Sequence, residues 1–337
     1  MMHKTRMFLG LSVLLLVAQP AAQAAATKDS TSAATPSAKA PHHIGISRNP
    51  YLGAIAVDAA NGKVLFEDHA DTKGYPASVQ KLMDLLIILE KVEQRQLSMQ
   101  DQVPVSARSA KTGGSQVWLA EKESFTVDEM LYALMVQSAN DAAVALAEKV
   151  GGSTEGFVDL MNQKAKALGM TSTVFHSVHG LPPGPGQEHD VTTARDLSIL
   201  CRELLKHSDT LRYTSTRERP FRPNQGKKTV IMRTHNHLMG RVDGCDGLKT
   251  GFFTQAGFSI AVTAARHGQR IVVVVLDSID LKTRDTKAAE LVAKGFAALP
   301  AASSAPASSV PAASAPAPAA PAVETAPPPP PTPPKSN

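Results

Sequence analysis

The sequence has 337 residues, a formal net charge of +5 and only two cysteines. The positive charge is mild and forms no long basic run, so nothing favours nucleic-acid binding. Cys201 and Cys245 stand in neither a Cys-x-x-Cys nor a Cys/His pattern, which argues against a zinc site. The two cysteines could pair in an oxidising compartment. We expect neither a metal nor an organic cofactor.

The N-terminal residues 1–24 have the pattern of a secretory signal peptide. A basic start precedes the apolar run Met7–Val17, and Ala22-Gln23-Ala24 offers a small-residue cleavage pattern. The apolar run is ~11 residues long, too short to cross a ~30 Å hydrocarbon core as a helix. We therefore expect a periplasmic or otherwise exported protein without an integral membrane span after signal removal.

Low-complexity segments flank a single body. Residues 25–47 are rich in Ala, Ser, Thr and Pro and predict a flexible lead-in, and residues 300–337 predict a disordered Pro/Ala-rich tail. Between them, residues 48–299 are enough for one domain with a substantial core.

The body begins with strand signals and continues with helical ones. Residues 51–57 and 64–67 around Asn61-Gly62 predict a β-hairpin. The apolar stretch from Lys81 to Glu90 contains no Gly or Pro and predicts a helix buried in the core. Further helices are expected over residues 124–136, 141–149, 157–168 and 193–207, with a loop over 181–186.

The body ends with two more strands and a last helix. Residues 258–263 and 271–276 predict paired strands around His267-Gly268, and residues 286–298 predict a helix. Strands at both ends of the body with helices between them predict one sheet built from both ends, an α/β (α+β) arrangement.

The first chemical motif is Ser78-Val79-Gln80-Lys81. A spacing of three places both side chains on one face of a helix. A serine hydroxyl needs an adjacent base to act as a nucleophile, and a lysine can be that base when burial lowers its pKa. The apolar helix after Lys81 predicts that burial.

Two more motifs follow in order. Ser138-Ala139-Asn140 lies between two expected helices, where Ser138 could relay a proton between Lys81 and a leaving group and Asn140 could hold Lys81. Lys249-Thr250-Gly251 lies just before an expected strand. Its lysine and hydroxyl could bind a substrate carboxylate, and Gly251 would let the backbone come close.

Each motif alone is weak evidence, because short patterns of this kind occur by chance. Lys111-Thr112-Gly113 is a second copy of the third motif, but it precedes Ser138 and reads as a loop. The order, spacing and setting of the three motifs together are far more specific than any one of them.

At these residues the chain resembles the low-molecular-mass penicillin-binding proteins, the D-alanyl-D-alanine carboxypeptidases of serine peptidase family S11. The resemblance extends over residues 48–297 and includes Gly114-Ser115, His179-Gly180-Leu181 and Thr193-Ala194-Arg195-Asp196. It implies a β-lactamase/transpeptidase-like fold, in which an antiparallel sheet flanked by helices packs with a helical subdomain.

The resemblance also implies a mechanism on peptidoglycan stem peptides and on β-lactams. Ser78 would attack the D-Ala-D-Ala carbonyl and Lys81 would take its proton. The backbone N–H groups of Ser78 and Phe252 would form the oxyanion hole. Arg284 would lie near the substrate carboxylate, which an arginine can bind in bidentate fashion.

The chain departs from the family pattern at three places. Gln80 and Asp84 stand where threonine is frequent, and Phe252-Phe253-Thr254 replaces an aromatic-then-threonine pair. The short layout, with only a Pro/Ala tail after the body, is similar to that of soluble DD-endopeptidases.

Two other functions compete with a D-Ala-D-Ala peptidase. A non-catalytic peptidoglycan-binding or sensor protein could keep the fold. A class A-like β-lactamase shares the motif order, but no Glu-x-x-Leu-Asn sequence lies between Asn140 and Lys249.

Overall fold

The computed structural model describes residues 50–222 and 229–300. The expected signal peptide (1–24), the lead-in (25–47) and the tail after Pro300 lie outside the described residues. Within the described ranges, no helix is both long enough and apolar enough to cross a bilayer.

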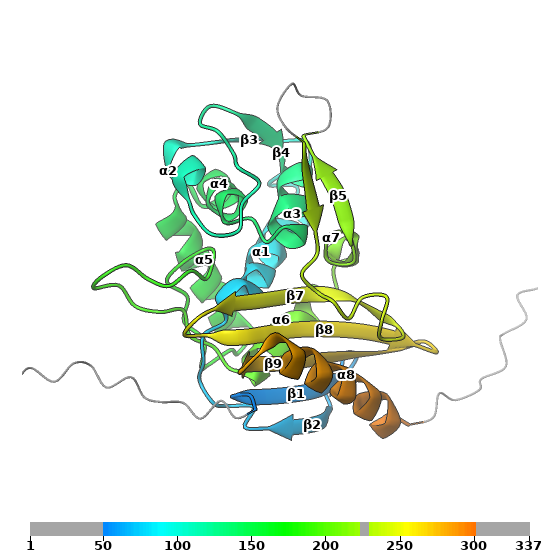
Figure 1. Cartoon of the computed structure of the whole chain (residues 1–337). Helices are drawn as coiled ribbons and strands as arrows, with labels where there is room; N and C mark the ends of the chain where they lie inside the picture. The colour runs from blue at the N-terminus through cyan, green and yellow to red at the C-terminus, as the bar shows by residue number, and fades with distance from the viewer. Residues whose placement is uncertain (1–49, 223–228, 301–337) are drawn as a thin grey trace, which may run out of the picture. The chain divides into compact units, whose positions relative to one another are not determined.

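A five-stranded antiparallel sheet is assembled from both ends of the body, as the sequence predicts. The strand order is β2-β1-β9-β8-β7 (Figure 1). These strands are β1 (Gly53–Asp58), β2 (Val64–Asp68), β7 (Cys245–Phe253), β8 (Gly257–Arg266) and β9 (Gln269–Ser278). The expected β1–β2 hairpin forms around Gly62, whose φ of 79° requires the left-handed region that glycine tolerates.

Helices cover both faces of this sheet, which explains the nearly continuous apolar run of β9. Helix α8 (Leu281–Ala298) packs Ala288, Leu291 and Val292 onto one face and is drawn in orange in Figure 1. On the other face, α6 (Ala194–Leu204) packs against β1 and β9 and joins a second apolar cluster with α1 (Lys81–Glu93). A strand covered on both faces loses the alternating pattern of a half-exposed one.

Helices α3 (Val127–Val136), α4 (Asn140–Gly151) and α5 (Thr154–Ala167) pack against α1, whose residues 81–89 are all buried. This burial confirms the predicted core helix. The other elements are η1 (Ala77–Gln80), α2 (Ala107–Lys111), α7 (Thr210–Thr214) and two small sheets, β3 (Gln102–Pro104) with β4 (Ser124–Thr126) and β5 (Glu218–Phe221) with β6 (Val230–Arg233).

Local sequence signals place several helix ends. Thr126 and Glu129 form a capping box at the start of α3, so the expected helix begins at Val127 and residues 124–126 form β4 instead. Gly152 ends α4 with a φ of 75°. The expected helix over 193–207 ends earlier, at Leu204.

The position of the third motif differs from the expectation, and the structure also answers the open question of cysteine pairing. Lys249-Thr250-Gly251 lies inside β7, not before a strand. Residues 247–251 are all buried because both faces of β7 are covered at this point, so the sequence shows no strand alternation there. Cys201 and Cys245 are both free. Cys201 belongs to the cluster under α6, whereas Cys245 packs with the cluster on the α8 side, so they do not pair.

Candidate active site

Ser78 lies in the short helix η1, which runs directly into α1. The preceding residue, Ala77, has a φ of 45°, an unfavourable conformation that the surroundings must hold in place. N–H groups in the first turn of a helix have no partner within the helix. The N–H of Ser78, the second residue of η1, is therefore available to a ligand.

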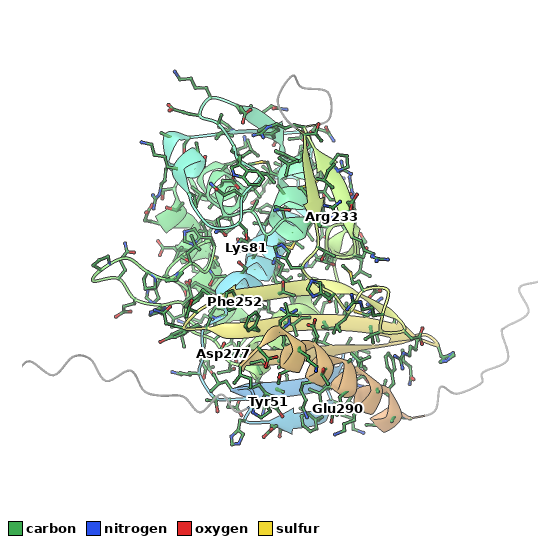
Figure 2. All side chains as sticks on the ribbon, viewed as in Figure 1. Tyr51, Lys81, Arg233, Phe252, Asp277 and Glu290 are labelled. Carbon is green, nitrogen blue, oxygen red and sulfur yellow. The ribbon has the colours of Figure 1, made fainter. Side chains whose placement is uncertain are left out.

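Lys81 is fully buried and is the centre of the site. Its Nζ lies 2.9 Å from Ser78 Oγ, 2.7 Å from Asn140 Oδ1 and 2.8 Å from the carbonyl oxygen of His179. Figure 2 shows Lys81 beside strand β7, between the sheet and the helices. The structure thus brings together the predicted nucleophile, base and asparagine.

The environment of Lys81 favours its neutral form. Burial lowers the pKa of Lys81 to about 7, and the nearby carboxyl groups of Asp84, Asp190 and Asp141 only partly oppose this effect. A neutral amine has two hydrogens and one lone pair. Asn140 Oδ1 and the His179 carbonyl can accept both hydrogens, which leaves the lone pair directed at Ser78 Oγ.

Asn140 is itself fixed from two sides at the start of α4. Its Nδ2 donates to the Gly113 carbonyl at 2.8 Å, and its backbone N–H donates to the Ser115 carbonyl at 2.7 Å. Its Oδ1 is therefore held toward Lys81. Gly113 belongs to the second Lys-Thr-Gly copy, and its contribution through a backbone carbonyl leaves no side-chain signal in the sequence.

The His179 carbonyl is positioned by the loop 176–180. Asp190 accepts from the backbone N–H of His176 at 2.6 Å, and from the N–H and Oγ of Ser177 at 2.8 and 2.7 Å. Gln80 Nε2 donates to the Ser177 carbonyl at 2.6 Å. Gln80, a departure from the family pattern, thus supports the loop that holds Lys81.

Gly180 lets this loop approach the nucleophile segment. A Cβ at Gly180 would lie 2.2 Å from the Ala77 carbonyl oxygen, and the φ of Gly180 is 75°. The sequence alone gives His179 and Gly180 no role, because no sequence motif reports where a backbone carbonyl points or why a side chain must be absent.

Lys249 forms a second buried cationic position next to the first. Its Nζ donates to Ser138 Oγ at 3.0 Å and to the Thr250 carbonyl at 2.9 Å. Burial lowers the pKa of Lys249, and the positive charges of Lys81 and Arg284 lower it further. Among the described residues, Ser138 Oγ is hydrogen-bonded to Lys249 and not to Lys81. A proton relay from Lys81 through Ser138 therefore stays a prediction.

Gly251 brings β7 against η1. A Cβ on Gly251 would lie 2.7 Å from the Pro76 carbonyl oxygen and 3.0 Å from the backbone nitrogen of Ser78. The close approach therefore requires glycine at this position. It also brings residue 251, which precedes Phe252, next to the backbone nitrogen of Ser78. An oxyanion hole formed by the N–H groups of Ser78 and Phe252 stays a prediction. The Phe252 side chain is exposed and stacks on Phe258, with 4.2 Å between the ring centroids.

Arg284 lies on α8 and is 2% exposed. Its Nη2 donates to Asp285 Oδ1 at 2.6 Å. Its charge contributes to the lowered pKa of Lys249, which places it near the motif. A role for Arg284 toward a substrate carboxylate stays a prediction.

Asp84 is a buried carboxyl group one helical turn after Lys81. Neither of its oxygens has a hydrogen-bond partner among the described residues, and the same is true of Gln80 Oε1. Burial raises the pKa of Asp84 well above its usual value of 3.8, and the Asp190 carboxyl adds to the rise while Lys81 opposes it. Because Gln80 and Asp84 are four residues apart, they lie on one face of the helix.

With this geometry established, the chain can be compared with known proteins. The profile of the D-alanyl-D-alanine carboxypeptidase family, Peptidase S11, matches residues 50–279. The chain is 35% identical over 244 residues to the D-alanyl-D-alanine carboxypeptidase DacF of Bacillus subtilis, covering 72% of this chain and 61% of the relative. It is 33% identical to DacC of Escherichia coli, covering 72% of this chain and 60% of the relative. It thus spans about three fifths of the length of these two relatives.

A solved structure shows a similar likeness. Penicillin-binding protein D2 of Listeria monocytogenes in its ampicillin-bound form is 32% identical, with a TM-score of 0.64 over 72% of this chain and 96% of that chain. The fold is thus similar to that of a penicillin-binding protein. The chain belongs to the D-alanyl-D-alanine carboxypeptidase family S11, and the expected fold and family are confirmed.

Proposed function

We propose that this protein is a serine-type D-alanyl-D-alanine carboxypeptidase or endopeptidase acting on peptidoglycan stem peptides. The observation that carries the proposal is the set of three contacts at Lys81 Nζ, which direct the lone pair of a neutral amine at Ser78 Oγ. Membership of the S11 family supports the same activity.

The reaction begins with attack of Ser78 Oγ on the carbonyl carbon of the D-Ala-D-Ala bond. The hydroxyl proton passes to Lys81 Nζ, and the backbone N–H groups of Ser78 and Phe252 stabilise the oxyanion. Collapse of the intermediate breaks the C–N bond, and the proton held by Lys81 passes through Ser138 to the leaving amine, which returns Lys81 to its neutral form. Water then attacks the ester carbonyl and gives a proton to Lys81, and Lys81 passes it to Ser78 Oγ as the ester C–O bond breaks, so that the peptide is released and Ser78 is regenerated.

Lys249, Thr250 and Arg284 bind the terminal carboxylate of the substrate in this proposal. Lys249 and Thr250 are both buried on β7, beside the glycine that contacts η1. Burial lowers the pKa of Lys249, and an arriving carboxylate reverses that effect by pairing with the ammonium form.

β-Lactams acylate Ser78 in the same way, because the ring amide stands in for the D-Ala-D-Ala bond. The likeness to penicillin-binding protein D2 in its ampicillin- and cefotaxime-bound forms supports this part. The proposal places the protein outside the cytoplasm, in the periplasm, where its polymeric substrate lies. The signal-like N-terminus of the sequence supports that location.

Two substrates test the proposal. The purified protein is incubated with a diacetyl-Lys-D-Ala-D-Ala peptide and, separately, with purified cross-linked muropeptide dimers, with Ser78→Ala as control. Release of D-Ala from the peptide defines a carboxypeptidase, and conversion of dimers to monomers defines an endopeptidase. If the protein processes neither substrate and does not react with penicillin, the proposal is overturned. Continuous nitrocefin hydrolysis without a burst would instead indicate a β-lactamase.

A further inference from the structure

Trp118 is the only tryptophan in the sequence, and its side chain is 62% exposed. Its backbone φ of 53° lies in the left-handed region. Such a conformation is unfavourable for a bulky residue and persists only where the surroundings impose it. Among the described residues, the indole ring has no hydrogen bond and no ring contact. Packing therefore does not explain why this side chain is held outward.

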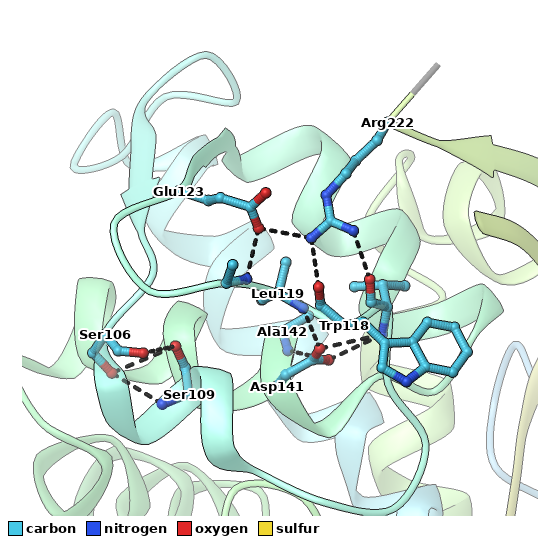
Figure 3. Close-up of polar contacts among 10 residues, drawn as sticks. Ser106, Ser109, Trp118, Leu119, Glu123, Asp141, Ala142 and Arg222 are labelled. Atoms are coloured by element: carbon cyan, nitrogen blue, oxygen red, sulfur yellow. Dashed lines mark hydrogen bonds and ion pairs between the residues drawn. The ribbon is translucent and has the colours of Figure 1, made fainter. Parts of the chain in front are cut away.

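Buried charged groups hold the backbone on both sides of Trp118 (Figure 3). The carboxylate of Asp141 accepts from the N–H of Val117 at 3.2 Å and from the N–H of Leu119 at 3.0 Å. The guanidinium of Arg222 donates to the carbonyls of Val117 at 3.0 Å and of Trp118 at 2.7 Å.

These two clamping side chains are themselves almost inaccessible. Asp141 is 0% exposed and Arg222 is 4% exposed, and Arg222 also pairs with Glu123 at 2.7 Å. Buried ionic groups with several hydrogen bonds fix a geometry firmly, because any rearrangement leaves a charge unpaired. The loop is therefore built to hold the backbone of one exposed aromatic residue in one conformation.

The loop is attached to the active site. Asp141 directly follows Asn140, whose side chain and backbone hold the carbonyls of Gly113 and Ser115. Residues 113–119 thus lie around the N-terminal end of α4, the end that presents Asn140 to Lys81. Trp118 is carried by the same rigid unit as the catalytic asparagine.

We infer that Trp118 is a stacking platform for a sugar ring of the glycan strand that carries the stem peptide. The inference rests on the proposed function, in which the substrate is a peptide attached to a sugar polymer. The stem peptide ends in charged groups, which buried Lys249 and Arg284 suit, whereas an uncharged indole face suits the C–H face of a pyranose. Because the backbone that carries the ring is already fixed, sugar binding has only the side-chain torsions of Trp118 left to order, which keeps the entropy loss small.

The single tryptophan makes a direct test possible. The Ser78→Ala protein is titrated with stem-free oligomers of N-acetylglucosamine and N-acetylmuramic acid, and separately with free stem peptide, while tryptophan emission is followed. We expect a saturable change in emission with the glycan and none with the peptide. No change with the glycan, or an equal change with the peptide alone, would overturn the inference.

Kinetics supply an independent measurement. The ratio of KM for a sugar-linked pentapeptide to KM for the same peptide without sugar should rise about three- to tenfold in Trp118→Ala, as expected for loss of one aromatic stacking contact, and less in Trp118→Phe. Ile231→Ala is the matched control, since Ile231 is 43% exposed on β6 and should leave the ratio unchanged. An unchanged ratio in a folded Trp118→Ala protein would contradict the platform.

Failure of the proposed function would look different. In that case wild-type protein would show no penicillin adduct at Ser78, whereas the emission titration would still report whether the glycan binds at Trp118.

Discussion

Asn140 Oδ1 lies 2.7 Å from Lys81 Nζ, and this contact decides which side of the amine faces the nucleophile. Together with the His179 carbonyl at 2.8 Å, it accepts the two hydrogens of a neutral amine. The remaining lone pair then has one polar neighbour, Ser78 Oγ at 2.9 Å. In the proposed mechanism, this geometry activates the serine together with the burial of Lys81.

The first prediction concerns the pH dependence of acylation. Burial lowers the pKa of Lys81 to about 7, and only the neutral amine can accept the Ser78 proton. The second-order rate of acylation by fluorescent penicillin should therefore be nearly constant above this pKa and fall about tenfold per pH unit below it. Stopped-flow labelling between pH 5 and 9 measures this fall in the acylation rate. A rate that stays constant down to pH 5 would show that Lys81 is not the titrating base.

The second prediction concerns the asparagine that orients the base. Asn140→Ala removes one of the two acceptors for the Lys81 hydrogens and should slow acylation ~10–100-fold, because the lone pair is no longer fixed. Asn236→Ala is a matched control. Asn236 is also buried and donates to the Gly247 carbonyl at 2.9 Å, but among the described residues it makes no hydrogen bond to a motif side chain. Equal losses in both variants would indicate a general loss of packing.

The third prediction concerns the close contact between β7 and η1. Gly251→Ala places a Cβ 2.7 Å from the Pro76 carbonyl oxygen, so one of the two segments must move. We expect acylation to fall ~100-fold or more, together with a loss of ~1–3 kcal/mol in unfolding free energy. In Gly184→Ala the added Cβ meets only the flexible Gln187 side chain, at 3.3 Å, and both quantities should stay near wild type. Wild-type acylation by Gly251→Ala would sink this account of the contact.

The fourth prediction concerns the unpartnered carboxyl group of Asp84. Its pKa is raised in the folded state, so the folded protein binds more protons than the unfolded chain once the pH rises above the usual value of 3.8. As the pH rises, the unfolding free energy of wild type should then decrease relative to that of Asp84→Asn. The decrease is up to about 1.4 kcal/mol per pH unit between the usual pKa of 3.8 and the raised pKa of the folded state. Denaturant unfolding of both proteins at pH 5 and pH 8 measures this. A stability difference that is the same at both pH values would contradict a protonated Asp84.

Much of the fold was predictable because its signals are local. The β1–β2 hairpin has its turn at Asn61-Gly62, the buried helix α1 follows an unbroken apolar run, and β8 and β9 are strongly apolar. The strand β7 was missed because both of its faces are covered and its polar motif interrupts the apolar pattern.

The side chains of the site were predictable, whereas its backbone groups were not. Ser78, Lys81 and Asn140 meet as the motif order implied. The roles of the Gly113 and His179 carbonyls could not be predicted, because every residue type has a backbone carbonyl and only the fold decides where it points. For the same reason, the hydrogen bonds from Asp141 and Arg222 to the backbone around Trp118 could not be predicted.

The central claim is that Ser78 is a nucleophile that forms a covalent acyl-enzyme. The most direct measurement is mass spectrometry of the intact protein and of its proteolytic peptides after incubation with benzylpenicillin. We predict one penicilloyl adduct per chain, located on the peptide that contains Ser78 and absent from Ser78→Ala. An adduct on another serine such as Ser138, or no adduct on the folded wild-type protein, would contradict the claim.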